Sequence, residues 1–192
     1  MAKVVVKSKI KKVKRKYPVE VKAPEYLNSY TLGKSEVTDL SSLVGKTAKV
    51  NLMYITGNVK NQNIRLTFRI NEVKSGLAST VVLKYEQIPY YLGRYVKAGS
   101  DLVEDSFVGK SKDGMNVRIK PFIVTKMNTS KLVLSLIRKK TQELVLNELS
   151  QKTYDEFISA IVNARVQMTF RTELKKISPL KAFEFKRIEL VK

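Results

Sequence analysis

The sequence contains no cysteine, no histidine and no tryptophan among its 192 residues. Without cysteine and histidine the chain cannot form a zinc site from these residues, an iron–sulfur cluster, a haem–histidine bond, a thiol nucleophile or a Ser-His-Asp triad. The absence of cysteine also excludes a disulfide framework, so nothing in the composition points to secretion. Any acid–base chemistry would depend on carboxylates, lysine or tyrosine.

Long apolar runs are absent as well. Near the N-terminus the longest run is Val4, Val5 and Val6, followed at once by Lys7, whereas a secretory signal needs roughly 7–15 apolar residues. No window approaches the roughly 20 apolar residues of a membrane-spanning helix. We therefore expect a cytoplasmic protein with an uncleaved N-terminus and no membrane partner.

Negative charge is scarce. Seventeen Asp and Glu face 37 Lys and Arg, so the formal net charge is +20 and the isoelectric point is about 10.0. Residues 1–16 carry no acid and eight of these cations: Lys3, Lys7, Lys9, Lys11, Lys12, Lys14, Arg15 and Lys16. Such a segment buries little apolar surface and repels itself, so we predict a basic RNA-binding tail that is disordered alone.

The remainder of the chain is cationic too. Without the eight cations of the tail, residues 17–192 keep 29 bases against 17 acids, a net charge of +12. Single domains usually carry a net charge of magnitude about 2–8. Because excess like charge destabilises a compact state, a bound polyanion would offset the cost. The charge balance therefore favours nucleic acid as the partner.

The apolar pattern predicts strands first, helices next and a return to strands. Alternation predicts strands at residues 48–54, 64–71, 77–86, 102–110, 116–126 and 166–171, and around residues 183–188. Helical spacing and capping residues predict helices at 88–98, from Thr129 or Ser130 to about 149, and at 153–164. Pro18 and Pro24 favour extended geometry, so residues 17–30 are predicted to be a surface connector.

Local signals support these boundaries. Asp113-Gly114 is typical of a hairpin turn, Pro121 indicates an edge or a bulge, and Thr153 with Glu156 forms a capping-box pattern. The order of elements predicts an α+β fold for residues 17–192, a single domain with a mostly antiparallel, barrel-like β core and flanking α-helices.

Several groups of cations on this domain are candidate RNA contacts. Arg65 and Arg69 share one face of the strand at 64–71, and the segment around Tyr90, Tyr91 and Tyr95 interleaves aromatic rings with Arg94 and Lys97. Aromatic rings beside cations can stack bases and hold phosphates. Packing of Tyr91, Leu92 and Tyr95 on the sheet is the favoured alternative. The other candidates are Lys110 and Lys112 at the hairpin and Arg138, Lys139 and Lys140 on the long helix.

Asp101, Glu104 and Asp105 form the densest acidic group. Two carboxylates can hold Mg²⁺, so a metal-dependent nuclease using Asp101 and Asp105 is one hypothesis. A solvated strand start, or salt bridges to Lys97, is the favoured alternative. We expect no catalytic residues, no metal site, no cofactor and no small-molecule substrate.

The chain resembles the small-subunit ribosomal protein family S-three-Ae, also called eukaryotic-type S-one. The stretches that carry the resemblance are Val21-Lys22-Ala23-Pro24, Leu32-Gly33-Lys34-Ser35 with Thr38, Leu43-Val44-Gly45-Lys46, Leu66-Thr67-Phe68-Arg69, Lys112-Asp113-Gly114 and Ile137-Arg138-Lys139-Lys140. They occur in this order, and the resemblance extends from about residue 17 to residue 188. The chain lacks the longer terminal extensions of eukaryotic members, so it resembles the short archaeal form.

The resemblance implies a non-catalytic component of the small (30S) ribosomal subunit with a β-barrel-like core. It implies a place on the platform, near the 3′ end of the small-subunit rRNA and the messenger exit, with neighbouring ribosomal proteins and messenger RNA as partners. We therefore expect an rRNA-binding structural protein of the cytoplasmic ribosome. The alternative is a free-standing, sequence-tolerant RNA- or single-strand-binding protein or chaperone.

Overall fold

The structure is a computed structural model that describes residues 16–191. The strands are β1 (Tyr17–Lys22), β2 (Thr31–Val37), β3 (Thr47–Asn51), β4 (Ile64–Lys74), β5 (Leu77–Gln87), β6 (Leu102–Glu104), β7 (Phe107–Lys110), β8 (Asn116–Thr125) and β9 (Leu180–Val191). The α-helices are α1 (Leu52–Thr56), α2 (Pro89–Gly93), α3 (Lys131–Gln151), α4 (Tyr154–Val162) and α5 (Arg165–Lys175). Three 3₁₀ helices, η1 (Glu25–Leu27), η2 (Leu40–Leu43) and η3 (Val59–Asn63), complete the described elements.

All nine strands belong to one mixed sheet. Every strand pairing is antiparallel except that of β1 with β5, which is parallel. The prediction of an α+β fold with a mostly antiparallel sheet is therefore confirmed. The predicted disorder of the tail concerns residues that lie outside the described range.

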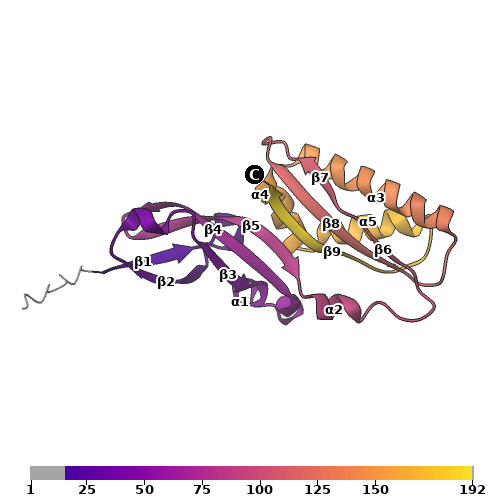
Figure 1. Cartoon of the computed structure of the whole chain (residues 1–192), viewed down its shortest axis with the longest axis horizontal. Helices are drawn as coiled ribbons and strands as arrows, with labels where there is room; N and C mark the ends of the chain where they lie inside the picture. Colours follow the sequence, from indigo (N-terminus) through magenta and orange to yellow (C-terminus); the bar gives the residue numbers. More distant parts are fainter. Residues whose placement is uncertain (1–15, 192) are drawn as a thin grey trace, which may run out of the picture.

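Strand β5 explains why the sheet does not close into the barrel-like form that the sequence suggested. Residues 77–79 of β5 pair with β1, and residues 84–86 of the same strand pair with β9. Since β4 occupies the other edge of β5 along its length, β1 and β9 follow one another along a single edge. The sheet therefore extends lengthwise, and the molecule is elongated, with β1–β4 at one end and the long helices at the other (Figure 1).

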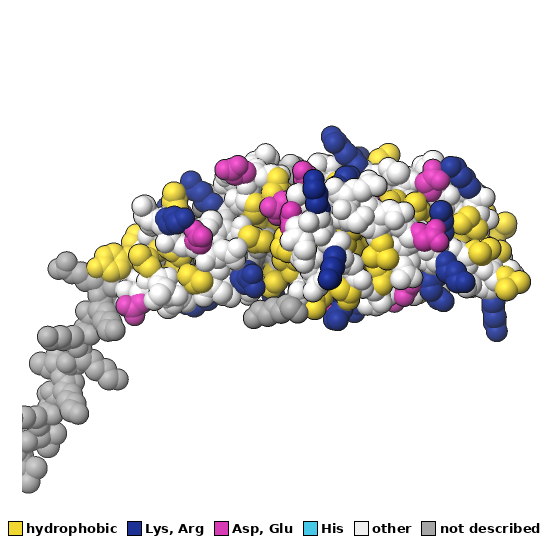
Figure 2. Space-filling view, turned by 90° about the horizontal axis from the view of Figure 1, so that it is seen from above, with side chains coloured by type: hydrophobic (Ala, Val, Ile, Leu, Met, Phe, Trp, Pro, Cys, Tyr) yellow, Lys and Arg dark blue, Asp and Glu magenta, His cyan; other side chains and the backbone are white. Residues whose placement is uncertain are grey.

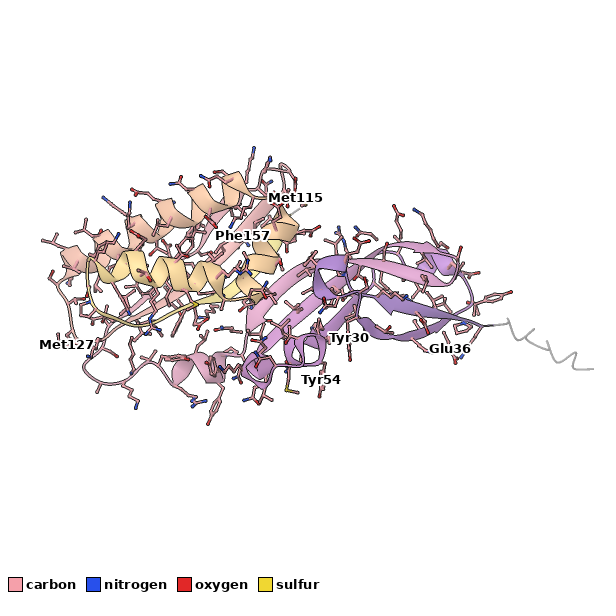
Figure 3. The ribbon with its side chains drawn as sticks, turned by 180° about the vertical axis from the view of Figure 1, so that it is seen from behind. Tyr30, Glu36, Tyr54, Met115, Met127 and Phe157 are labelled. Atoms are coloured by element: carbon pink, nitrogen blue, oxygen red, sulfur yellow. The ribbon has the colours of Figure 1, made fainter. Side chains whose placement is uncertain are left out.

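The main core lies between the sheet and the helical layer of α3, α4 and α5 (Figures 1 and 3). It includes fully buried Phe68 from β4, Tyr85 from β5, Phe157 from α4 and Phe185 from β9. A smaller apolar cluster joins β1 and β2 to the start of β5, with Val19, Val37 and Ala78 among its members.

Part of the opposite face of the sheet is covered by α2. Leu92 of α2 packs against Phe122, Val124 and Ala182, with Tyr91 and Tyr95 alongside. Because side chains alternate between the faces of a strand, Phe122 and Val124 point away from Ile123, which belongs to the main core. The helical layer and α2 therefore lie on opposite faces.

Many predicted elements are confirmed. Strands β4, β5, β8 and β9 lie where alternation placed strands, and the Asp113-Gly114 turn joins β7 to β8. A register shift in the β8–β9 pairing at Pro121 confirms the predicted bulge. Ser130 caps α3, and Thr153 with Glu156 forms the predicted capping box of α4.

The prediction of a strand at 166–171 was wrong, because these residues belong to helix α5. Val166, Phe170 and Leu174 are buried at a spacing of four residues, which is one face of a helix. The six-residue stretch fits a period of two as well as a period of four, and Leu174 lies beyond the stretch that was considered.

The strand predicted at 48–54 ends early. Asn51 accepts a hydrogen bond from the backbone N–H of Met53 and so caps α1, and Gly57 ends that helix with a positive φ of 66°. Leu52 and Tyr54 therefore lie on a one-turn helix. Similarly, the helix predicted at 88–98 is shorter than expected, since α2 ends at Gly93, although Pro89 occupies its first turn as predicted.

Two further boundaries differ from prediction. Residues 17–30 include strand β1 as well as a connector. Pro18 is tolerated in β1 because the parallel pairing with β5 begins only at Glu20. The N–H that proline lacks is therefore not needed for a hydrogen bond to β5. The single strand predicted at 102–110 is divided into β6 and β7, and Asp105 accepts a hydrogen bond from the N–H of Ser106 at the break.

Candidate nucleic-acid interface

The face of the sheet opposite the helical layer collects cations from six strands. Residues paired directly across antiparallel strands share a face. One row across the sheet therefore contains Asn51, Arg65, Glu86, Arg187 and Lys120. The next row contains Lys49, Thr67, Lys84, Glu189, Arg118 and Val108.

Two more cations extend this surface. Arg69 is paired with Thr47 two residues beyond Thr67 on β4, and Lys110 is paired with Asn116 on β8. We call this surface the open sheet face. Its charged members are Lys49, Arg65, Arg69, Lys84, Lys110, Arg118, Lys120 and Arg187 with Glu86 and Glu189. Eight cations and two carboxylates give it a net charge of +6.

The two carboxylates pair with three of the cations. Glu86 lies 2.5 Å from Arg187 and 3.3 Å from Lys84, and Glu189 lies 3.6 Å from Arg118. Burial raises the pKa of Glu86, but hydrogen bonds and charge from Arg187 and Lys84 outweigh it and lower that pKa below its ordinary value. Glu86 is therefore ionised at neutral pH and orients its two neighbours.

The other five cations of the open sheet face form no ion pair with any residue in the range 16–191. They are Lys49, Arg65, Arg69, Lys110 and Lys120. With strands about 4.8 Å apart, a surface from β3 to β7 spans roughly 24 Å. An array of unpaired cations over this distance can neutralise several phosphates of one nucleic-acid strand.

Sequence reasoning found only part of this array. It named Arg65, Arg69 and Lys110, and the structure brings these three to one face. It missed Lys49, Lys84, Arg118, Lys120 and Arg187. Alternation places Arg118 and Lys120 on one side of their strand, but only the register between strands shows that this side faces away from the helices.

The three predicted cations of the long helix do not form one cluster. Arg138, Lys139 and Lys140 are all exposed on α3, but consecutive helical residues point about 100° apart. Lys140 also lies 3.2 Å from Glu143. Because α3 belongs to the helical layer, these cations lie on the side of the sheet opposite the open sheet face.

The candidate cations of the long helix and those of the hairpin lie far apart. The N–H of Lys112 donates to the carbonyl of Lys152, at the C-terminal end of α3. The Arg138 triplet lies more than three turns earlier, so at 1.5 Å per residue it is roughly 20 Å away. Figure 2 shows Lys and Arg side chains spread over the upper surface, more densely at the helical end.

The aromatic segment at α2 has two parts. Tyr91 and Tyr95 pack edge to face with ring centroids 5.5 Å apart and hydroxyl oxygens 2.7 Å apart, and Arg94 lies over the Tyr91 ring at 5.7 Å. This confirms that Tyr91, Leu92 and Tyr95 pack on the sheet. Tyr90, in contrast, is 85% exposed and is available to stack on a base. Arg94 and Lys97 are exposed on the same segment.

The acidic group near β6 has local structural partners. Asp101 accepts hydrogen bonds from the N–H and hydroxyl of Thr129, at 2.6 and 3.3 Å, and holds the segment that leads into α3. Asp105 accepts from Ser106 N–H at 2.8 Å, and Glu104 pairs with Lys186, not with Lys97. Within residues 16–191, no three acidic side chains gather as metal ligands would.

Of the tail cations, Lys16 alone is described, and it is exposed directly before β1. The candidates Lys3, Lys7, Lys9, Lys11, Lys12, Lys14 and Arg15 lie outside the described residues. None of the helices between residues 16 and 191 is both long enough and apolar enough to span a membrane.

Comparison with known proteins agrees with the sequence resemblance. Residues 5–192 match the model of the ribosomal S3Ae family. The small ribosomal subunit protein eS1 of Haloarcula marismortui is 30% identical over 180 residues, which cover 94% of this chain and 84% of the relative. The protein of the same name from Halorubrum lacusprofundi is 30% identical over 95% of this chain and 84% of its own.

A more distant relative matches over a similar length. The small ribosomal subunit protein eS1 of Nanoarchaeum equitans is 25% identical over 177 residues, which cover 92% of this chain and 89% of the relative. The family match extends over both the sheet and the helical layer. The chain therefore belongs to the ribosomal S3Ae family.

Proposed function

We propose that this protein is a structural constituent of the small ribosomal subunit that binds small-subunit rRNA through the open sheet face. The observation that carries the proposal is the array of five unpaired cations among the eight on that face. Neutralising closely spaced phosphates would release condensed counterions and offset the charge repulsion within the domain. Membership of a ribosomal family supports this assignment.

In this proposal the basic N-terminal residues 3–16 form a second RNA-binding segment. The single folded domain of residues 17–192 holds the open sheet face in position. Arg94 and Lys97 extend the cationic surface beside α2, and Tyr90 offers a ring for an unpaired base. Lys112 at the β7–β8 turn is a further phosphate contact, whereas Arg138, Lys139 and Lys140, which were predicted with it, lie on the side of the sheet away from the open sheet face. By family resemblance we place the protein in the cytoplasmic ribosome, on the platform near the rRNA 3′ end and the messenger exit.

A titration of small-subunit rRNA at several salt concentrations tests the role of the sheet face. The variant replaces Lys49, Arg65, Lys110 and Lys120 with Gln. We expect weaker binding and a salt slope smaller by about 0.7–0.9 for each phosphate contact removed. The same titration with residues 2–16 deleted tests the tail, and we expect lower affinity and a flatter slope there too.

The matched control replaces four exposed cations with Gln. They are Lys126, which precedes α3, Lys131 in α3, and Arg165 and Lys175 in α5. Both variants lose the same charge, so a difference between them reports the position of the cations. Equal losses of affinity and slope would show that the domain binds by its net charge alone. That result would contradict the open sheet face as the RNA interface.

The alternative is a free-standing RNA-binding protein or chaperone, which the exposed ring of Tyr90 beside the cationic face would also suit. Sedimentation of native extract through a high-salt gradient separates the two functions. Quantitative comigration with the small subunit supports the ribosomal function, and a mostly unbound pool supports the alternative.

A further inference from the structure

The first third of α3 has apolar side chains on more than half of its circumference, and Lys131, Ser135 and Arg138 occupy the remaining side. It contains Leu132, Val133, Leu134, Leu136 and Ile137 within two turns. An apolar surface this wide on a helix is normally covered by other parts of the protein or by a partner. Here Ile137 is fully buried in the main core, whereas Leu132 is 79% exposed and Leu136 is 54% exposed.

The two exposed leucines form an outward stripe with a cation. The inner side of α3 is marked by the buried positions Ile137, Thr141, Val145 and Leu149. Leu132, Leu136 and Lys139 follow at a spacing of four and three residues, so they share the side that points away from the core. Figure 2 shows hydrophobic side chains among Lys and Arg at the end of the molecule where α3 begins.

Positive charge predominates in this part of the chain, although Asp101 contacts Thr129 and Glu143 pairs with Lys140. Residues 126–140 contain no acid and five cations: Lys126, Lys131, Arg138, Lys139 and Lys140. The end of α5 lies at the same end of the molecule, because the N–H of Lys126 donates to the carbonyl of Pro179 at 2.9 Å. Exposed Lys175, the last residue of α5, therefore lies toward that end of the molecule as well.

We propose that Leu132 and Leu136 are the docking surface for a neighbouring protein of the small subunit. The occupant is an acidic amphipathic helix, whose apolar side chains cover the two leucines while its Asp and Glu meet the surrounding lysines. This inference rests on the proposed function, because it places the chain within an assembled subunit. It gives the molecule an RNA side at the open sheet face and a protein side at the helical layer.

Other occupants fit less well. An RNA backbone offers charged phosphates and hydroxyls, which do not bury a pair of leucine side chains. In a dimer with two-fold symmetry, the same five cations of the two copies would face each other and repel. The basic N-terminal residues of this chain carry eight cations and no acid, so they would be repelled in the same way.

Photo-crosslinking in assembled small subunits tests the inference. A benzophenone amino acid replaces Leu132 in one preparation and Gln142, an exposed residue of the same helix, in a control preparation. We expect position 132 to crosslink to one subunit protein, at a peptide in which Asp and Glu flank apolar residues, and position 142 to crosslink to it weakly. Crosslinks from position 132 to rRNA alone, or to no subunit component, would overturn the inference.

A double variant gives a second measurement. Leu132→Ser with Leu136→Ser should lower the amount of the crosslinked protein in small subunits by about tenfold, as loss of a buried anchor does. The purified variant should keep its circular dichroism spectrum and bind small-subunit rRNA within about twofold of wild type. Val59→Ser with Met168→Ser, two exposed apolar residues elsewhere, is the matched control.

The outcomes separate the two proposals. If the double variant loses rRNA affinity while the neighbouring protein stays in place, the leucines are an RNA contact and the docking surface is wrong. The proposed function is tested separately, by cosedimentation of the wild-type chain with small subunits in the high-salt gradient. A mostly unbound wild-type chain would contradict the proposed function whatever the double variant does.

Discussion

At the residue scale, Gly109 shows how closely β7 and α3 approach. A Cβ atom at this position would lie 2.6 Å from Cδ2 of Leu146 and 2.8 Å from Cδ2 of Leu149. Leu149 is fully buried, so its side chain has little room to move. Gly109→Ala should therefore lower the free energy of unfolding by about 1–3 kcal/mol, the usual cost of overpacking a core. Urea denaturation measures this difference.

Gly33→Ala is the matched control for that substitution. Gly33 lies in edge strand β2, and no atom lies within 4 Å of the Cβ position. Its replacement should change the free energy of unfolding by less than about 0.5 kcal/mol. Equal destabilisation by the two substitutions would show that steric contact with α3 is not the cause.

Glu184 illustrates a buried charge with incomplete compensation. Burial raises its pKa above the ordinary value of 4.5, while a hydrogen bond from Gln87 at 2.9 Å and the charge of Arg171 offset part of the effect. The folded state therefore binds the proton more tightly than the unfolded state. By linkage, the carboxyl reduces stability progressively as the pH rises above its ordinary pKa.

Glu184→Gln should remove this pH-dependent cost. We expect a higher free energy of unfolding than wild type at neutral pH, because the amide carries no charge and can still accept from Gln87. The advantage should shrink as the pH falls toward the ordinary carboxyl range. Urea denaturation over a pH series measures it, with Glu143→Gln on the exposed side of α3 as the control. An advantage that is constant with pH would show that charge burial is not responsible.

At the element scale, the start of α4 depends on its capping box. The hydroxyl of Thr153 accepts from Glu156 N–H at 3.3 Å, and the Glu156 carboxylate accepts from Thr153 N–H at 3.0 Å. Thr153→Ala should therefore cost about 0.5–2 kcal/mol of unfolding free energy. Thr169→Ala, at an exposed position of α5, tests whether losing any threonine hydroxyl has the same effect, and it should be nearly neutral. Urea denaturation compares them.

Elements with a local signal were predictable. Capping residues located the starts of α3 and α4, and the Asp113-Gly114 turn located the β7–β8 hairpin. Short stretches without a decisive period were not. Residues 166–171 suit a strand or a helix equally until Leu174 is included, and α1 is one turn that tertiary packing of Leu52 and Ile55 stabilises.

At the scale of the whole molecule, we propose that residues 17–192 unfold as one unit. The main core includes residues from Ala23 near the start to Ile188 near the end, and β5 connects both ends of the sheet. Thermal unfolding should therefore give one transition whose calorimetric and van't Hoff enthalpies agree. Two separate transitions, for example one for β1–β4 and one for the helical end, would contradict the proposal.

The distribution of charge also belongs to this scale. Composition alone indicated a polyanion as the partner, and the resemblance in short motifs indicated the family to which the chain belongs. Three of the eight cations on the open sheet face were recognised in advance. The other five come from β3, β5, β8 and β9, which are far apart in sequence, and only strand register brings them into two neighbouring rows.

The amino-acid sequence by itself determined the excess of positive charge, the absence of cysteine and histidine chemistry, and most strands and caps, because these depend on composition or on neighbours within a few residues. The tertiary structure alone decided that the sheet stays open, that its uncovered face is cationic, and that two leucines of α3 face outward. These properties depend on which strands share an edge of β5 and which face the helices cover. Such choices are made by the packing of the whole chain.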